Sequence, residues 1–185
     1  ELNPRLIYCA ISGFGADGPA AQRPSYDAVA QAASGFLKLL VNPANPRVVG
    51  PAIADALTGF YAAYGILGAL YEREKQKTTK GRKVEVSMFE AMTHFNLDAF
   101  THLFSEGEVM GPYSRPSVSQ SYVLPCADGK WLCVAGNSDL IFARLMAAIG
   151  RPELAAEPRF ATNALRCAAA GELDAHVQRL HQRCR

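Results

Sequence analysis

The sequence lacks an excess of charge of either sign, and its cysteines form no recognisable framework. Nineteen lysines and arginines face seventeen aspartates and glutamates, a formal net charge of +2, which gives no general attraction to nucleic acids or anionic membranes. The five cysteines are an odd number, and no Cys-x-x-Cys or His-x₃-His spacing predicts a zinc site or a disulfide set. We therefore expect no metal, no nucleic-acid or membrane partner, and a reducing cytoplasmic location.

Two further absences argue against a dinucleotide fingerprint and a membrane span. Gly13-Phe14-Gly15 supplies two glycines of a Gly-x-Gly-x-x-Gly pattern, but the third is missing, so NAD binding is not predicted. The longest apolar stretch, residues 51–71, contains Asp55 and ends in the charged run 72–75. Such a stretch is typical of a buried helix rather than a transmembrane one.

What the sequence has is the composition of a folded protein with mixed helices and strands. Hydrophobic residues make up 49% of the chain and charged residues 19%, which is enough for a core. Hydrophobic periodicity and turn residues predict strands at 6–12 and 83–87, a hairpin at 122–135, and helices at 26–35, 53–75, 89–104 and 138–149. The glycines of the longest helix, Gly59, Gly65 and Gly68, are expected to let neighbouring backbones approach closely.

Domain boundaries are predicted from one segment rich in glycine, proline and small polar residues. This segment, residues 106–119, is the best linker candidate, so residues 1–105 are expected to form one domain and residues 120–185 a second. The chain begins at Glu1 without a methionine or leader, and the helical pattern after Glu172 has no stop signal. We therefore expect an internal piece of a longer protein.

Asp55 stands at the start of the most apolar helical segment, and two interpretations fit that position. Aspartate is a favoured N-cap, because its carboxylate accepts hydrogen bonds from the unpaired amides of a first helical turn. Alternatively, the helix dipole and nearby donors favour an ionised carboxylate, the form that attacks a carbonyl carbon as a nucleophile. The spacing leaves both interpretations open.

A second polar cluster comprises Arg23, Ser25, Tyr26 and Asp27, which bring a guanidinium, a phenol and an acid within five residues. In one interpretation Asp27 is another N-cap, and Tyr26 packs against the helix as a hydrophobic staple. In the other, Arg23 binds a phosphate or carboxylate, and Asp27 positions a reacting centre. Spacing does not choose between them.

Two other sets of polar residues are given structural roles. The basic run 75–83 is interpreted as a solvated loop, because no aromatic residues are interleaved with it to stack on bases. His94 and His102 fall on one predicted helix, but no acidic or cysteine partner in the sequence completes a metal set. We therefore expect both histidines to be structural.

The most specific stretch is Ala54-Asp55-Ala56-Leu57-Thr58-Gly59 followed by residues 65–74, and further characteristic segments are residues 80–88, 127–129, 150–154 and 158–163. In these segments, and collinearly over nearly the whole chain, the sequence resembles the family III CoA-transferases. This group contains formyl-CoA:oxalate CoA-transferase, carnitine CoA-transferases and the related α-methylacyl-CoA racemases. The resemblance implies an α/β fold, comprising part of a Rossmann-like large domain plus an incomplete α+β small domain.

The same resemblance implies a mechanism and a set of partners. Asp55 matches the family's nucleophilic aspartate, which forms a mixed anhydride and then an aspartyl-CoA thioester. Coenzyme A enters as a co-substrate, and Arg23, Ser25, Tyr26 and Asp27 would border its thiol end. Family subunits form interlocked homodimers, so the 185-residue piece alone is expected to be inactive.

Alternatives within and outside the family remain. In the racemases a histidine precedes the acid that matches Asp27; here the residue is Tyr26, and a phenol is a poor base near neutral pH, which favours a transferase. No glycine-only run occurs between residues 118 and 137, which argues against formate and oxalate as substrates. Residues 119–121 and 136–137 could line an acyl pocket or simply form turns. A non-catalytic scaffold is the alternative from a different class.

Overall fold

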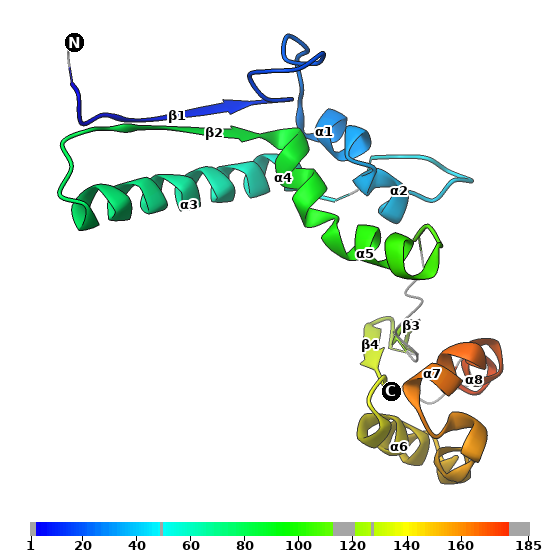
Figure 1. Cartoon of the computed structure of the whole chain (residues 1–185). Helices are drawn as coiled ribbons and strands as arrows, with labels where there is room; N and C mark the ends of the chain where they lie inside the picture. Colours follow the sequence, from blue (N-terminus) through cyan, green and yellow to red (C-terminus); the bar gives the residue numbers. More distant parts are fainter. Residues whose placement is uncertain (1–2, 49, 113–120, 127, 178–185) are drawn as a thin grey trace. The chain divides into compact units, whose positions relative to one another are not determined.

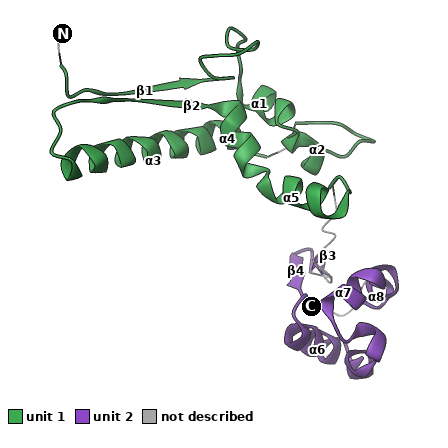
Figure 2. Cartoon of the chain, in the orientation of Figure 1, with its two compact units in different colours: residues 1–114 green, residues 115–185 purple. Residues whose placement is uncertain are grey.

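A computed structural model describes residues 3–48, 50–112, 121–126 and 128–177. The chain divides into two compact units, Glu1–Ser114 (unit 1) and Arg115–Arg185 (unit 2), drawn in different colours in Figure 2. Residues 113–119 of the predicted linker lie outside the described residues. The assignment of 1–105 and 120–185 to a large and a small domain therefore stays a prediction.

Unit 1 is built on two parallel strands with helices between and after them. Its elements, in chain order, are β1 (Ile7–Ser12), α1 (Asp27–Ala33), α2 (Phe36–Leu40), α3 (Ile53–Lys75), β2 (Arg82–Ser87), α4 (Met88–Phe95) and α5 (Leu97–Glu106). β1 and β2 pair from Ile7 opposite Arg82 to Ser12 opposite Ser87. Parallel strands need a long crossover connection, which α1, α2 and α3 supply. α3 runs back along both strands, so its first turn lies near their carboxyl ends (Figure 1).

The core of unit 1 includes the first turn of α3. Ala30 of α1, Phe36 of α2, Ala54 of α3 and Met92 of α4 belong to one buried cluster. Because Ala54 is completely buried and successive helical residues are turned by about 100°, the packing fixes the direction in which the next residue, Asp55, points. The core thus sets the orientation of the first turn of α3.

The prediction of one helix over residues 89–104 is wrong at its centre. Asn96 ends α4, and a new helix, α5, begins at Leu97. The Asn96 side chain is buried, and its Nδ2 donates a hydrogen bond to the backbone oxygen of Ser34 at 2.8 Å. A tertiary bond to the residue after α1 accompanies the break, and no local pattern signals it.

One glycine of α3, not three, serves a close approach to a neighbour. A Cβ atom added at Gly65 would come within 2.7 Å of Val84 Cγ1 on β2, whereas nothing lies within 4 Å of such an atom at Gly59 or Gly68 among the described residues. Gly65 therefore lets α3 pack directly on the strand pair. The expectation that all three glycines act in this way is corrected.

Substituting these glycines gives a matched test of that packing. Gly68→Ala should raise the free energy of unfolding by up to about 1 kcal/mol, because alanine is the better helix former. Gly65→Ala should lower it by about 1–2 kcal/mol, since overpacking against Val84 outweighs the same propensity gain. Urea unfolding followed by circular dichroism measures both changes. Equal stabilisation by the two substitutions would contradict close packing at Gly65.

α3 is also long and apolar enough to cross a membrane, judged by length and composition alone. That criterion is weak, because core helices of other proteins meet it too.

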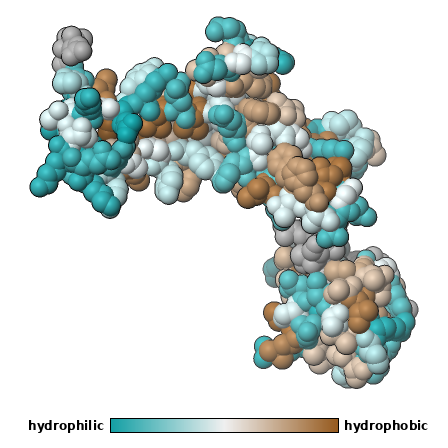
Figure 3. All heavy atoms as spheres, viewed as in Figure 1, coloured by the Kyte–Doolittle hydropathy of each residue, from teal (hydrophilic) through white to brown (hydrophobic). Residues whose placement is uncertain are grey.

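The expectation that α3 is a buried helix is only partly right. Ala54, Thr58, Ala62 and Ala69 are buried, whereas a second face carries the side chains of Phe60, Tyr64, Leu67 and Tyr71, each 63–72% exposed. Figure 3 shows hydrophobic patches on the surface of unit 1.

The first elements that the structure describes in unit 2 are the strands of the predicted hairpin, β3 (Ser121–Pro125) paired antiparallel with β4 (Trp131–Ala135). It continues through α6 (Asp139–Ala148), the 3₁₀ helices η1 (Pro152–Ala156) and η2 (Pro158–Phe160), α7 (Asn163–Ala168) and α8 (Ala170–Val177). Its core packs Leu124, Phe142, Met146, Leu154, Phe160 and Leu173, with further apolar residues around them.

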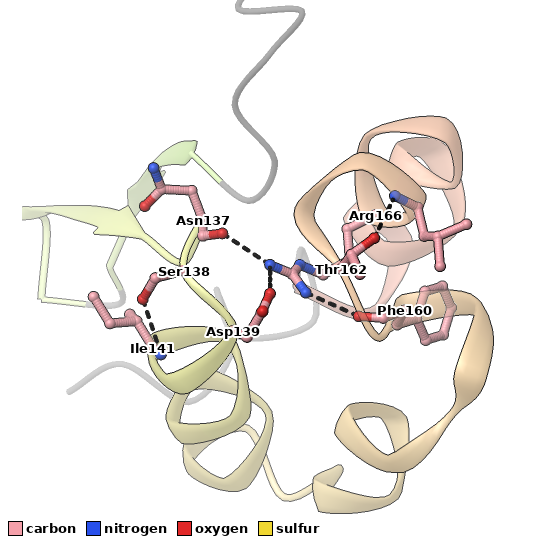
Figure 4. A network of polar contacts seen from close by, with 8 residues as sticks. Asn137, Ser138, Asp139, Ile141, Phe160, Thr162 and Arg166 are labelled. Carbon is pink, nitrogen blue, oxygen red and sulfur yellow. Dashed lines mark hydrogen bonds and ion pairs between the residues drawn. The ribbon is translucent and has the colours of Figure 1, made fainter.

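A completely buried arginine joins three parts of unit 2 (Figure 4). Arg166 of α7 donates from Nη1 to the Phe160 backbone oxygen at 2.9 Å, and from Nη2 to the Asn137 backbone oxygen and Asp139 Oδ1, each at 2.8 Å. Its guanidinium carbon also lies 4.6 Å from the centre of the Phe142 ring. One side chain therefore ties η2, the start of α6 and α7 together.

Candidate functional site at the first turn of α3

The loop after β1 folds back on itself and places Ser25 beside Gly13. A Cβ atom at Gly13 would overlap the Cβ of Ser25, and the Gly13 backbone oxygen accepts a hydrogen bond from Phe89 N at 3.0 Å. Glycine is therefore required where the loop touches both its own end and the start of α4. The Ser25 hydroxyl donates a hydrogen bond to the Tyr26 backbone oxygen at 3.3 Å.

Arg23 and Tyr26 are both exposed. The Arg23 guanidinium carbon lies 5.5 Å from the centre of the Phe14 ring, a cation–π arrangement that leaves its polar edge open to an anion. Tyr26 is the N-cap residue of α1 without a side-chain cap bond, and it is 81% exposed. The interpretation of Tyr26 as a packing staple is wrong, because its ring faces solvent in the described structure.

Asp27 caps a helix, but not its own. Its Oδ1 accepts hydrogen bonds from the backbone N–H of Ala54 at 2.7 Å and of Asp55 at 3.3 Å, both in the first turn of α3. A carboxylate at a helix N-terminus is stabilised by the unpaired amides and by the positive end of the helix dipole. The N-cap interpretation for α1 is corrected: Asp27 closes the amino end of α3 from 27 residues away.

Asp55 is exposed, and its side chain makes no hydrogen bond with any residue that the structure describes. The N-cap position of α3 is occupied by Ala52, three residues earlier. The interpretation of Asp55 as the cap is therefore wrong, because Asp27 takes the amides that Asp55 would have capped. Both oxygens of the Asp55 carboxylate are therefore available to another partner.

All four amides of the first turn of α3 are paired. Ile53 N donates to the Pro51 oxygen at 2.8 Å and Ala56 N to the Ala52 oxygen at 3.2 Å, while Asp27 accepts from the two amides between them. An oxyanion formed at Asp55 would therefore have to find its hydrogen-bond donors in another segment.

The structure thus brings Asp27 into direct contact with the Asp55 backbone, with Tyr26 adjacent in sequence. Within the described residues, no hydrogen bond or ion pair joins Arg23 or Ser25 to α3. Sequence reasoning missed Gln31, whose side chain bonds Asp27. The Asp27–Gln31 spacing of four residues places both on one helical face and was an available signal.

Two cations of the basic run 75–83, Arg82 and Lys83, form ion pairs with nearby glutamates. Arg82 is hydrogen-bonded and ion-paired to Glu72, and this contact holds the pKa of the Glu72 carboxyl below its usual range. Lys83 Nζ lies 2.7 Å from Glu85 Oε1. A polar pocket of about 200 Å³ lies between Glu72, Gln76, Lys80 and neighbouring residues. The prediction of a solvated loop over this run holds only for residues 76–81, because Lys75 ends α3 and Arg82 and Lys83 lie in β2.

A second, apolar pocket of about 460 Å³ lies in the connection between α2 and α3. Its lining combines apolar side chains with two cations: Leu37, Lys38, Val41, Pro43, Pro46, Arg47, Val48 and Pro112. Of the acyl-pocket residues suggested by sequence, 119 and 120 lie outside the described residues. The Asn137 backbone oxygen accepts a hydrogen bond from Arg166, which is a structural contact within unit 2.

Comparison with known proteins agrees with this architecture. The family model for CoA-transferase family III matches residues 1–184. Succinyl-CoA–D-citramalate CoA-transferase of Chloroflexus aurantiacus is 34% identical over 94% of this chain and 43% of its own length. Acetyl-CoA:oxalate CoA-transferase of Acetobacter aceti is 37% identical over 88% of this chain and 42% of its own length.

Solved structures give the same result for the fold. A CaiB/BaiF family protein from Brucella suis superimposes with a TM-score of 0.74 at 32% identity, covering 97% of this chain and 48% of that one. A Mycobacterium tuberculosis protein, 24% identical, superimposes with a TM-score of 0.81 over 98% of this chain and 47% of its own, which supports the fold alone. The chain therefore spans less than half the length of these relatives, and it belongs to the family III CoA-transferases.

Proposed function

We propose that the intact protein is an acyl-CoA:carboxylic acid CoA-transferase in which Asp55 is the nucleophile. The observation that carries the proposal is the different state of two carboxylates at the start of α3. The Asp27 carboxylate accepts hydrogen bonds from the backbone amides of Ala54 and Asp55, whereas the Asp55 carboxylate is exposed and makes no hydrogen bond among the described residues. A carboxylate in that state can attack an electrophile without first giving up a protein hydrogen bond.

The first half of the reaction transfers CoA from donor to enzyme. An Asp55 oxygen attacks the thioester carbonyl of the donor, the C–S bond breaks, and a mixed anhydride forms while CoA leaves as a thiolate. The thiolate then attacks the Asp55 carbonyl carbon of the anhydride. An aspartyl-CoA thioester forms, and the donor acid leaves as a carboxylate. No proton needs to be removed from either reactant in these steps.

The second half repeats the same bond changes with a new acid. The acceptor carboxylate attacks the aspartyl thioester, giving a second anhydride and CoA thiolate. The thiolate attacks the acceptor carbonyl, which produces the new acyl-CoA and restores the Asp55 carboxylate. Because thioester and anhydride intermediates are hydrolysed by water, the intact site must exclude water during the cycle.

The neighbouring residues take supporting roles in this proposal. Asp27 holds the backbone of Asp55 through its amide bond and so positions the reacting carboxylate. Arg23, Ser25 and Tyr26 border the thiol end of CoA, where the open edge of Arg23 suits an anionic group. The chemistry requires no metal, since the nucleophile is an ionised acid.

The relatives suggest the class of substrate. Their names specify CoA transfer between succinyl- or acetyl-CoA and di- or hydroxydicarboxylic acids. The test is to incubate the intact protein with succinyl-CoA and a panel of short dicarboxylic acids, and to detect new acyl-CoA thioesters by mass spectrometry. The expected result is a new acyl-CoA together with an equal amount of free succinate. Hydrolysis of succinyl-CoA without any new thioester would contradict the proposal.

The proposal includes a homodimer of the intact protein and an inactive isolated 185-residue piece. In support, Phe60, Tyr64, Leu67 and Tyr71 recur at three- and four-residue steps on α3 and are largely exposed in this chain. An apolar face of this kind is normally covered by other protein segments. Light scattering of the intact protein measures the subunit number, and a monomer that transfers CoA would contradict this part.

A further inference from the structure

The buried amide of Gln31 is not explained by packing. Its side chain is 0% exposed, its Nε2 donates to Asp27 Oδ2 at 2.6 Å, and its Oε1 has no partner among the described residues. The nitrogen must face Asp27, because a carboxylate only accepts hydrogen bonds. A buried amide with an unpaired oxygen is destabilising relative to an apolar side chain of similar size. Glutamine therefore costs stability at this position.

The bond from Gln31 fixes the plane of the Asp27 carboxylate. With Oδ2 held by Gln31, Oδ1 points at the amides of Ala54 and Asp55. The terminal torsion of an aspartate is otherwise broad and weakly restrained. Losing the Gln31 bond would let the carboxylate turn, and with it the hydrogen bond that orients the Asp55 backbone would weaken.

Gln31 is itself held by a relay of buried polar groups. Its backbone oxygen accepts a hydrogen bond from Ser34 Oγ at 3.1 Å, and the Ser34 backbone oxygen accepts one from Asn96 Nδ2 at 2.8 Å. Ser34 and Asn96 are both buried. The junction of α4 and α5 therefore anchors the end of α1 from which Gln31 reaches Asp27.

We infer that Gln31 is a positioning residue for CoA transfer: through Asp27 it sets the orientation of Asp55. The inference rests on the proposed function, since it assigns a role within the same site. Among the described residues, the Gln31 side chain is hydrogen-bonded to Asp27 and to none of the residues proposed to border CoA. Its effect is therefore expected in kcat and not in the binding of acyl-CoA.

The test is kinetic, with stability measured alongside. In the intact protein, Gln31→Met keeps the volume and removes the donor. It should lower kcat about 10–100-fold, because small misplacement of a reacting group has effects of this size, while KM for acyl-CoA changes by less than about twofold. The melting temperature should stay the same or rise, since the unpaired oxygen is removed. Gln31→Asn keeps an amide that is too short to reach Asp27, and the same loss of kcat is expected.

Gly65→Ala is the stability control, because the added Cβ atom would overpack against Val84 of β2 and leave Gln31, Ser34 and Asp27 unchanged. It should lower stability and leave kcat within about twofold of the parent. The inference is overturned if both Gln31 variants fold and keep the parent kcat while an Asp55 variant is inactive. If the Asp55 variant is instead fully active, the proposed function fails, and the two failures are thereby distinguished.

Discussion

Asp55→Asn should reduce kcat for CoA transfer in the intact protein by at least about 10³-fold, because an amide cannot form the anhydride or the aspartyl thioester. The substitution keeps the size of the side chain, and the Asp55 side chain makes no hydrogen bond among the described residues that the change would break. Folding should therefore be unaffected. Steady-state transfer assays and circular dichroism measure the two effects.

Asp98→Asn is the matched control for this prediction. Asp98 is also an exposed aspartate in the first turn of a helix of unit 1, α5, so the substitution removes the same charge in a comparable setting. Transfer by this variant should equal that of the parent. If Asp55→Asn and Asp98→Asn behave alike, Asp55 is an ordinary surface carboxylate, and a scaffold without catalytic activity becomes the better explanation.

Arg166→Met should destabilise unit 2 by about 2–4 kcal/mol. The substitution leaves the backbone oxygens of Phe160 and Asn137 without the donors that they have now, and hydrogen bonds to charged groups each contribute about 1.5–3 kcal/mol. The recovered desolvation cost of the buried guanidinium offsets part of that loss. Hydrogen exchange of peptides from residues 131–177 of the intact protein reports the change as lost protection.

Arg159→Met separates this burial effect from the loss of an arginine as such. Arg159 is exposed and pairs with Glu157 and Glu172, and its guanidinium also lies over a ring, that of Phe160 at 4.6 Å. Exposed ion pairs contribute little, so protection of the same peptides should hardly change. Equal effects of the two substitutions would show that the buried network does not stabilise unit 2.

The sequence predicted well where the pattern was local and long. The helix over residues 53–75 was predicted with its observed ends, because its apolar residues recur through six turns and a charged run marks its end. β1, β2 and the hairpin of unit 2 were predicted within one residue at most of their ends. The family and its α/β fold were recognised from segments spread over the chain, and the comparisons confirm both.

The arrangement of the site could not be predicted in the same way. Whether Asp55 caps α3 depends on Asp27, which is far away in sequence and is brought there only by the packing of α1 against α3. The break at Asn96 likewise depends on a contact with Ser34. A single sequence indicates that both aspartates lie near helix starts, but it does not show that Asp27 caps α3 and that Asp55 caps neither helix.

Covalent trapping measures most directly whether Asp55 is an acyl relay. The intact protein would be incubated with acyl-CoA, quenched with hydroxylamine, digested, and mapped by mass spectrometry. If Asp55 is the nucleophile, a hydroxamate forms at the Asp55 side chain in the presence of acyl-CoA and is absent without it. A hydroxamate at any other carboxylate, or none under turnover conditions, would contradict that role of Asp55.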